Sequence, residues 1–222
     1  MAQNSEFTPA LGRPGLTWLY DFAIRLLTRE HRWRSLLVRQ VSPQAGDTIL
    51  DIGCGTGSLA ILLKRAAPQA TVIGLDPDPA ILERARAKAK RAGVEIDFRQ
   101  GFARDAAAVG AASKVVSSLV FHQVPMAEKR AGFAAAYQAL QPGGALHIAD
   151  YGLQRTALMR RLFRQVQRLD GFENTQPNAD GVLPSLMQAA GFVDVREQTV
   201  VPTPTGSISL YVARRPLQAA AG

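Results

Sequence analysis

The sequence has few of the residues that build disulfides and metal sites. Its 222 residues include one cysteine and three histidines, which excludes an internal disulfide and a cysteine-rich zinc site. No apolar run approaches the roughly 20 residues that span a bilayer. The N-terminus lacks the basic start and apolar stretch of a secretory signal. We therefore expect a soluble cytoplasmic protein.

Acidic residues are also scarce, 18 against 26 lysines and arginines, which leaves a net charge of +8. Most of the excess lies in two short segments. Residues 1–40 carry six basic and three acidic groups, and residues 151–175 carry five and two. The long middle of the chain is nearly balanced. Positive charge that is concentrated in two segments favours an anionic binding partner.

Predicted strands and helices alternate through that middle. Apolar runs at 48–52, 71–75, 94–99, 115–121 and 145–149 predict strands, and amphipathic segments at 59–67, 77–92 and 127–140 predict helices. This alternation predicts a parallel sheet with helices on both faces. Two later runs, 192–201 and 207–213, are too close together for a crossover and should pair antiparallel. The expected fold class is α/β, with a Rossmann-like, mostly parallel sheet of seven strands whose last strand is antiparallel.

We expect one domain over residues 16–215. It should comprise an N-terminal helical cap over 16–41, a cofactor-binding half over 42–150 and a substrate half over 151–215. Further helices are predicted at 156–169 and 183–190. A mobile arm should precede the domain at 1–15, and a tail should follow at 216–222.

A glycine-rich loop follows the first predicted strand. Gly53, Gly55 and Gly57 alternate with other residues directly after Asp51. Glycine permits a tight turn and lets backbone N–H groups approach a ligand at the positive end of the next helix. The loop also lies at the carboxyl end of a strand, where open α/β sheets bind their ligands. It is therefore the strongest candidate for a binding site.

Asp76 ends the second predicted strand, 21 residues after Gly55, and an acid there can accept hydrogen bonds from ribose hydroxyls. Two nucleoside cofactors fit this arrangement. A dinucleotide would need its fingerprint at 55–60, three residues beyond the strand, and Asp51 would then face a pyrophosphate. A cofactor with a zwitterionic amino-acid tail and no phosphate gives Asp51 a role. That cofactor is S-adenosylmethionine.

The motif D-I-G-C-G-T-G at 51–57 resembles the first motif of the class I S-adenosylmethionine-dependent methyltransferases. Residues 74–76 are similar to the acid-ended second strand of that family, 140–144 to its L-x-P-G-G turn, and 148–150 to the end of its fifth strand. Tyr20-Asp21, 31–33 and 183–192 resemble the ubiquinone/menaquinone-biosynthesis C-methyltransferase branch (methyltransferase type 11). The resemblance covers 18–215.

The resemblance implies a cofactor site built from the glycine loop and the ends of the next strands. Phe102 departs from the family's pattern, because an Asp or Asn usually stands there and binds the adenine amino group. We expect the Phe102 ring and backbone N–H groups to hold adenine instead; the alternative is that the cofactor binds less tightly. The predicted cofactor-binding residues are Asp51, Gly53, Cys54, Gly55, Gly57, Asp76, Pro77, Gly101, Phe102 and Val120.

His122 ends the fourth predicted strand and should face the reaction cleft. Imidazole titrates near neutral pH, so His122 is a candidate general base; the alternative is a histidine that only lines the pocket. The resemblance implies that Tyr20 and Asp21 close over the methionine end of the cofactor, whereas a plain helix-surface pair is the competing interpretation. Cys54 has no base nearby in sequence, and we expect a passive role. No metal is required.

The other histidines are predicted to be structural. His147 lies within the fifth strand, and His31 with Arg32 and Trp33 should pack the N-terminal helix onto the domain.

Arginines recur at helical spacing in both basic segments, so each set forms a stripe on one helix face. A solvated face explains such stripes, and so does an anionic acceptor or an anionic membrane surface. We predict that four of these arginines affect acceptor use and leave cofactor affinity unchanged: Arg25, Arg29, Arg160 and Arg164.

These features favour methyl transfer from S-adenosylmethionine to a small-molecule acceptor that is quinone-like or anionic. We expect a monomer or homodimer with peripheral contact to an anionic membrane. A phospholipid N-methyltransferase at the membrane surface, an NAD-dependent oxidoreductase and a non-catalytic binding protein remain open alternatives. No nucleic-acid partner is expected, because residues 120–125 lack a stacking pair that would hold a flipped base.

Overall fold

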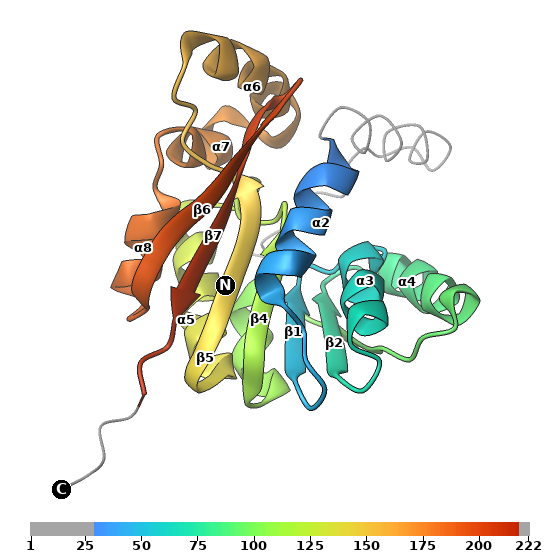
Figure 1. Cartoon of the computed structure of the whole chain (residues 1–222). Helices are drawn as coiled ribbons and strands as arrows, with labels where there is room; N and C mark the ends of the chain where they lie inside the picture. Colours follow the sequence, from blue (N-terminus) through green and yellow to red (C-terminus); the bar gives the residue numbers. More distant parts are fainter. Residues whose placement is uncertain (1–28, 218–222) are drawn as a thin grey trace, which may run out of the picture.

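The computed structural model describes residues 29–217 (Figure 1). Seven strands form one sheet in the order β3-β2-β1-β4-β5-β7-β6. The strands are β1 (Thr48–Ile52), β2 (Thr71–Asp76), β3 (Asp97–Gln100), β4 (Ala112–Ser118), β5 (Leu140–Tyr151), β6 (Val193–Thr203) and β7 (Gly206–Arg214). The helices are α2 (Glu30–Val41), α3 (Ser58–Ala66), α4 (Pro79–Ala92), the 3₁₀ turn η1 (Ala103–Val109), α5 (Met126–Ala139), α6 (Ala157–Asp170), α7 (Phe172–Ala179) and α8 (Leu183–Ala189).

The pairing of the strands confirms the predicted fold class. Strands β1 to β5 pair in parallel, while β7 pairs antiparallel with both β5 and β6. Asp51 near the end of β1 lies opposite Gly74 of β2 and Val116 of β4. The carboxyl ends of these three central strands therefore meet at one edge of the sheet, where α/β folds bind ligands.

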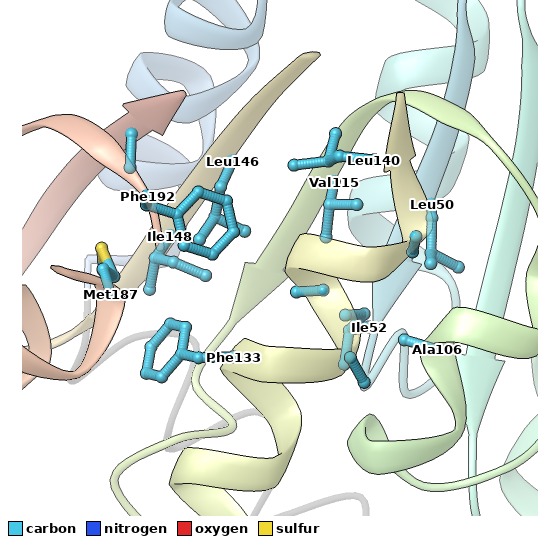
Figure 2. Close-up of a cluster of buried hydrophobic side chains, with 14 of the residues drawn as sticks. Leu50, Ile52, Ala106, Val115, Phe133, Leu140, Leu146, Ile148, Met187 and Phe192 are labelled. Carbon is cyan, nitrogen blue, oxygen red and sulfur yellow. The ribbon is translucent and has the colours of Figure 1, made fainter. Parts of the chain in front are cut away.

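Alternate residues of each strand supply the two faces of the core, because side chains of a strand point to opposite sides of the sheet. Leu50 and Ile52 belong to a cluster with α5 and α8, part of which Figure 2 shows. Ile49 lies on the other face, in a cluster with α2, α3 and α6. Asp51 shares the face of Ile49, so its carboxyl group points toward the side covered by helices α2 and α3.

Helix α2 packs through fewer residues than predicted. Trp33 and Leu37 are fully buried, whereas His31 and Arg32 are exposed, so the packing expected of His31 and Arg32 is wrong. His147 is structural, as predicted. It is buried on β5, and its Nδ1 lies 3.2 Å from the Nε2 of Gln40. Burial, with Lys114 and Arg214 nearby, lowers the pKa of His147 to about 4.

Two helical segments of the structure were not predicted from the sequence pattern. Helix α7 includes Pro177 and lacks an apolar repeat; it is held by polar contacts instead. The Thr175 hydroxyl donates to the Gly171 carbonyl at 2.7 Å, and the Asn178 side chain donates to the Tyr151 carbonyl at 2.9 Å. The alanine-rich segment 103–109 forms η1. Strand β5 also begins earlier than predicted, at Leu140.

Within residues 29–217, no helix combines the length and the apolar character that crossing a bilayer requires.

Candidate active site

The glycine loop is tied to the neighbouring strand before α3 begins. The N–H groups of Gly53 and Cys54 donate to the carbonyl of Leu75 at 2.7 and 3.0 Å. The N–H of Gly57 then donates to the Cys54 carbonyl at 2.9 Å, which closes a tight turn. Since the first N–H groups of a helix lack partners within it, α3 offers donors at the end of this loop.

All three motif glycines have a left-handed backbone, with φ of 68°, 52° and 73° at Gly53, Gly55 and Gly57, a region that side chains disfavour. Their surroundings differ. A Cβ at Gly53 would lie 2.2 Å from Cγ2 of Val120, and one at Gly57 would lie 2.8 Å from Cζ of Phe98. At Gly55, no atom of the described residues lies within 4 Å of that position. The loop is packed at both ends and open at its centre.

Asp76 stabilises the open centre of the loop. One carboxylate oxygen accepts the N–H of Gly55 at 2.9 Å, and the other accepts the N–H of Asp78 at 3.1 Å. Burial raises the pKa of Asp76, while these two N–H donors oppose the rise. Each oxygen keeps a further lone pair, so the carboxylate can still accept hydroxyl donors from a ligand.

Asp51 is fully buried at the end of β1. Neither of its carboxylate oxygens has a donor in hydrogen-bonding geometry among residues 29–217. Burial raises the pKa of Asp51 to about 7; the Arg34 guanidinium and the Ala60 amide act in the lowering direction, and Asp76 raises the pKa further. This buried acid is costly, because the Arg34 and Ala60 groups do not offset the hydration that it loses. Such a group fits a site whose ligand brings its own donors.

The end of β3 leads into two further predicted cofactor-binding residues, Gly101 and Phe102. The N–H of Gly101 donates to the Asp76 carbonyl at 3.1 Å, and the Gln100 side chain donates to the Pro77 carbonyl at 3.2 Å. Phe102 is 36% exposed, and the Arg104 guanidinium lies over its ring at 4.3 Å from the centroid. The ring is thus partly exposed, with Arg104 over one of its faces.

A family model described as a methyltransferase domain matches residues 49–144, which include the glycine loop, Asp76 and the end of β4. The strand order and this match agree with the motif at 51–57. Residues 49–144 therefore resemble the methyltransferase domain of the class I S-adenosylmethionine-dependent enzymes.

Similar proteins bear related names. A demethylmenaquinone methyltransferase of Thermus thermophilus is 37% identical over 138 residues, which span 60% of this chain and 60% of that relative. An uncharacterized methyltransferase of Synechocystis sp. is 27% identical over 89% of this chain and 91% of its own length. A solved structure of an O-methyltransferase family protein from Burkholderia thailandensis has a TM-score of 0.70 at 19% identity, over 90% of this chain and 59% of that chain, and supports the fold alone.

In the matched region, the cysteine of the glycine loop is buried. Burial, together with Asp51 and Asp76, raises the pKa of the Cys54 thiol. Its Sγ faces the Gly55 carbonyl at 3.7 Å. A thiol in this state stays protonated and is a poor nucleophile, which agrees with the passive role predicted for it.

The loop after β4 brings His122 between two acids. Its Nδ1 lies 2.7 Å from Oδ1 of Asp150, and its Nε2 lies 3.3 Å from Oδ2 of Asp170. Burial would lower the pKa of His122, but the Asp150 carboxylate and then Asp170 outweigh it and raise the pKa to about 9. A general base needs a free ring nitrogen. This geometry leaves none, so it argues against the predicted role of His122.

Asp150 organises the same loop. Its carboxylate accepts the N–H groups of Val120, Phe121 and Tyr151 at 3.1, 2.7 and 2.8 Å, in addition to the His122 contact. Sequence reasoning missed Asp150 as a site residue, although its position at the end of a strand matches that of Asp76. Val120, a predicted cofactor-binding residue, packs against Gly53 of the glycine loop.

Lys129 of α5 was missed as well, and no sequence signal marks it. It is fully buried, and its ammonium group donates to the carbonyls of Phe121, Val124 and Asn174, the last two at 2.8 and 2.9 Å. Burial lowers the pKa of Lys129 to about 8, and Asp150 opposes the shift. The ammonium thus joins the loop after β4 to α7.

Helix α6 carries the second arginine stripe. The Arg160 side chain has a partner within the chain, because its Nε donates to the Gln154 carbonyl at 2.8 Å. Arg161, Arg164 and Arg168 are exposed, and none forms an ion pair with another described residue. Beside them lie exposed apolar side chains at 64%, 61% and 62% of full accessibility: Leu158, Leu169 and Phe172.

Three predicted residues of the N-terminal segment lie outside the described residues: Tyr20, Asp21 and Arg25. Arg29 is described and exposed at the start of α2.

Proposed function

We propose that this protein transfers a methyl group from S-adenosylmethionine to a small-molecule acceptor. The observation that carries the proposal is the buried Asp51 carboxyl, which has no donor among the described residues, beneath a glycine loop that is open at Gly55. An ammonium group next to Asp51 would supply the missing donors. A pyrophosphate there would place like charges together, which disfavours the NAD alternative.

The residues present fit the parts of this cofactor. The N–H groups of the glycine loop and the first turn of α3 suit the carboxylate of the amino-acid tail. Asp51 suits its ammonium group, Asp76 the ribose hydroxyls, and Phe102 the face of adenine. The bound cofactor would supply a methyl group on a sulfonium, ready for displacement by a nucleophile.

The chain's own contribution to the reaction would be position and exclusion of water. The loop at 120–124 lies beside the glycine loop through Val120 and Gly53. An acceptor held over this loop would face the cofactor site, and correct orientation can replace much of the entropy cost of a bimolecular step. Since both nitrogens of His122 face carboxylates, a proton would leave the acceptor to solvent or to a group other than this ring.

The acceptor class that we propose is an aromatic, lipid-like molecule such as a quinone precursor. Names of relatives that refer to demethylmenaquinone support it. So does the exposed face of α6, on which arginines without an ion pair among residues 29–217 adjoin Leu158 and Leu169. Apolar side chains next to cations suit the interface of an anionic bilayer, where such an acceptor would reside.

Calorimetric titration with S-adenosylhomocysteine tests the cofactor assignment. Two variants should lose affinity by tenfold or more: Gly55→Ala, whose methyl group would enter the open space, and Asp76→Ala, which loses an acceptor worth roughly 1–3 kcal/mol. Gly46→Ala is the matched control, because Gly46 also has a positive φ of 83° and open surroundings but lies in the loop between α2 and β1. Affinity for NAD, or unchanged binding by both variants, would contradict the proposal.

Sedimentation with lipid vesicles tests the membrane surface. The triple change of Arg161, Arg164 and Arg168 to Gln should weaken binding to phosphatidylglycerol vesicles, since each cation near an anionic bilayer contributes about 1 kcal/mol. Vesicles of phosphatidylcholine should bind neither form. A control with the exposed basic residues of α4, Arg84, Lys90 and Arg91, changed to Gln carries the same loss of charge elsewhere. Equal loss in both triples would leave only a general effect of net charge.

A further inference from the structure

Two side-chain networks join the loop after β4 to helices α6 and α7. In the first, His122 lies between Asp150 at the end of β5 and Asp170 at the end of α6, at 2.7 and 3.3 Å. His122 is 6% exposed and Asp150 1%, whereas Asp170 is 19% exposed. The histidine therefore connects a buried acid of the sheet with a partly exposed acid of the α6–α7 pair.

The second network runs through Lys129 and Asn174. The Lys129 ammonium donates to the Asn174 carbonyl as well as to two carbonyls of the loop. The Asn174 side chain in turn donates to the Gln123 carbonyl at 3.2 Å. Residues 121–124 are thus linked to Asn174 of α7 both directly and through Lys129. The contact between His122 and Asp170 links the same loop to α6.

The joined segment adjoins the glycine loop. Val120, two residues before His122, fills the space beside Gly53 so closely that a Cβ on this glycine would lie 2.2 Å from it. The N–H of Val120 is itself held by Asp150. Asp170 is therefore connected to the glycine loop through a short series of contacts.

We propose that His122 is a positioning residue: with both ring nitrogens protonated, it joins Asp150 to Asp170 and holds the α6–α7 pair against the loop that follows β4. Each ring nitrogen faces a carboxylate oxygen, which is an acceptor, and a neutral ring can donate to only one of them. The imidazolium is thus the form that the geometry requires. The proposal rests on the proposed function only in that the acceptor would enter beneath α6 and α7.

Other charged and titratable groups near the His122 ring also affect how stability depends on pH. Tyr151 stands edge-on to it at 5.0 Å between ring centroids, Lys129 interacts with Asp150, and Asp150 acts on Tyr211, whose pKa burial raises to about 12. The raised pKa of His122 means that its contribution is complete below 6.5 and is lost as the pH rises toward about 9. Lys129, whose pKa is lowered to about 8, acts in the opposite direction, so total stability does not isolate His122.

Hydrogen exchange and NMR of the whole protein, without cofactor or acceptor, test the proposal. In the parent, the ring nitrogens of His122 should titrate well above 6.5, and Asp170→Asn should lower that pKa by about one unit. The same variant should reduce the protection of α6 and α7 amides by about tenfold near neutral pH, while β1 and β4 stay protected. In the parent, protection of α6 and α7 should fall toward that of the variant as the pH passes the pKa of His122.

Glu173→Gln is the control, because it removes an exposed acid three residues away that has no ion pair with the described residues. It should match the parent in both measurements, and Asp170→Glu should restore part of the protection. A His122 that titrates near 6.5, or equal protection of α6 and α7 in Asp170→Asn and the parent, would overturn the proposal. Neither readout involves methyl transfer, so failure to bind S-adenosylhomocysteine would overturn the proposed function alone.

Discussion

The two sides of the candidate active site are held by different kinds of contact. On the cofactor side, the glycine loop depends on backbone geometry: three left-handed glycines and N–H groups that donate to Leu75 and Asp76. On the opposite side, charged side chains hold the loop after β4, through Asp150, His122 and Lys129. The backbone contacts of the glycine loop tolerate almost no change of residue. The side-chain contacts of the loop after β4 depend instead on charge and pH.

Gly53→Ala should produce the largest effect, because it breaks the backbone-held side. The new Cβ would lie 2.2 Å from Val120 in a left-handed conformation with φ of 68°. Strain and overpacking together should lower the free energy of unfolding by about 4 kcal/mol. Thermal unfolding of the variant and of the parent measures this loss of stability. Gly46→Ala should cost only the strain, about 1 kcal/mol, and similar losses in the two variants would contradict the packing argument.

Lys129→Met tests the charge-held side. The change leaves three carbonyl groups without their ammonium donor, and we expect a loss of about 3 kcal/mol in the free energy of unfolding. Affinity for S-adenosylhomocysteine should change little, because Lys129 lies on the other side. Arg130→Met, an exposed neighbour on the same helix, is the control in urea unfolding. A larger loss of affinity than of stability would show that the two sides are not separable.

Asp51→Asn should stabilise the free protein. Since the pKa of Asp51 is raised from 3.8 to about 7, the native state carries a penalty for the charged form that is complete above about pH 7 and absent below 3.8. The variant should gain about 2 kcal/mol near pH 8, less at lower pH, and lose cofactor affinity. Asp97→Asn, an exposed acid of β3, should do neither. An Asp51 variant that is less stable than the parent near pH 8 would refute this account.

Phe102→Ala should have the smallest effect. If the ring covers adenine, its removal weakens binding of S-adenosylhomocysteine by about 1 kcal/mol, from lost apolar contact and stacking. Phe172→Ala removes a more exposed ring, at 62%, from the other side and should leave that affinity unchanged. Calorimetry of the two variants compares them directly, and equal affinities would remove Phe102 from the site.

The same contrast explains how much could be predicted from the sequence. The sheet, its antiparallel last strand and the glycine loop follow from apolar periodicity and from glycines at fixed spacing, all of which are local. The contacts of His122 with Asp150 and Asp170 join residues 28 and 48 positions apart in the chain, and no spacing rule brings them together. Helix α7 was missed for a related reason, because its fixed points are the hydrogen bonds of Thr175 and Asn178 and not an apolar stripe.

If Asp51 binds an ammonium group as proposed, its raised pKa would couple cofactor binding to the release of protons. With a pKa of about 7, this carboxyl is protonated in about half of the free molecules at neutral pH. An ammonium group placed against it would lower that pKa and expel the remaining proton. The observed heat of binding near pH 7 should therefore include the protonation heat of the buffer for up to about half a proton, and the affinity should rise with pH between about 6 and 8.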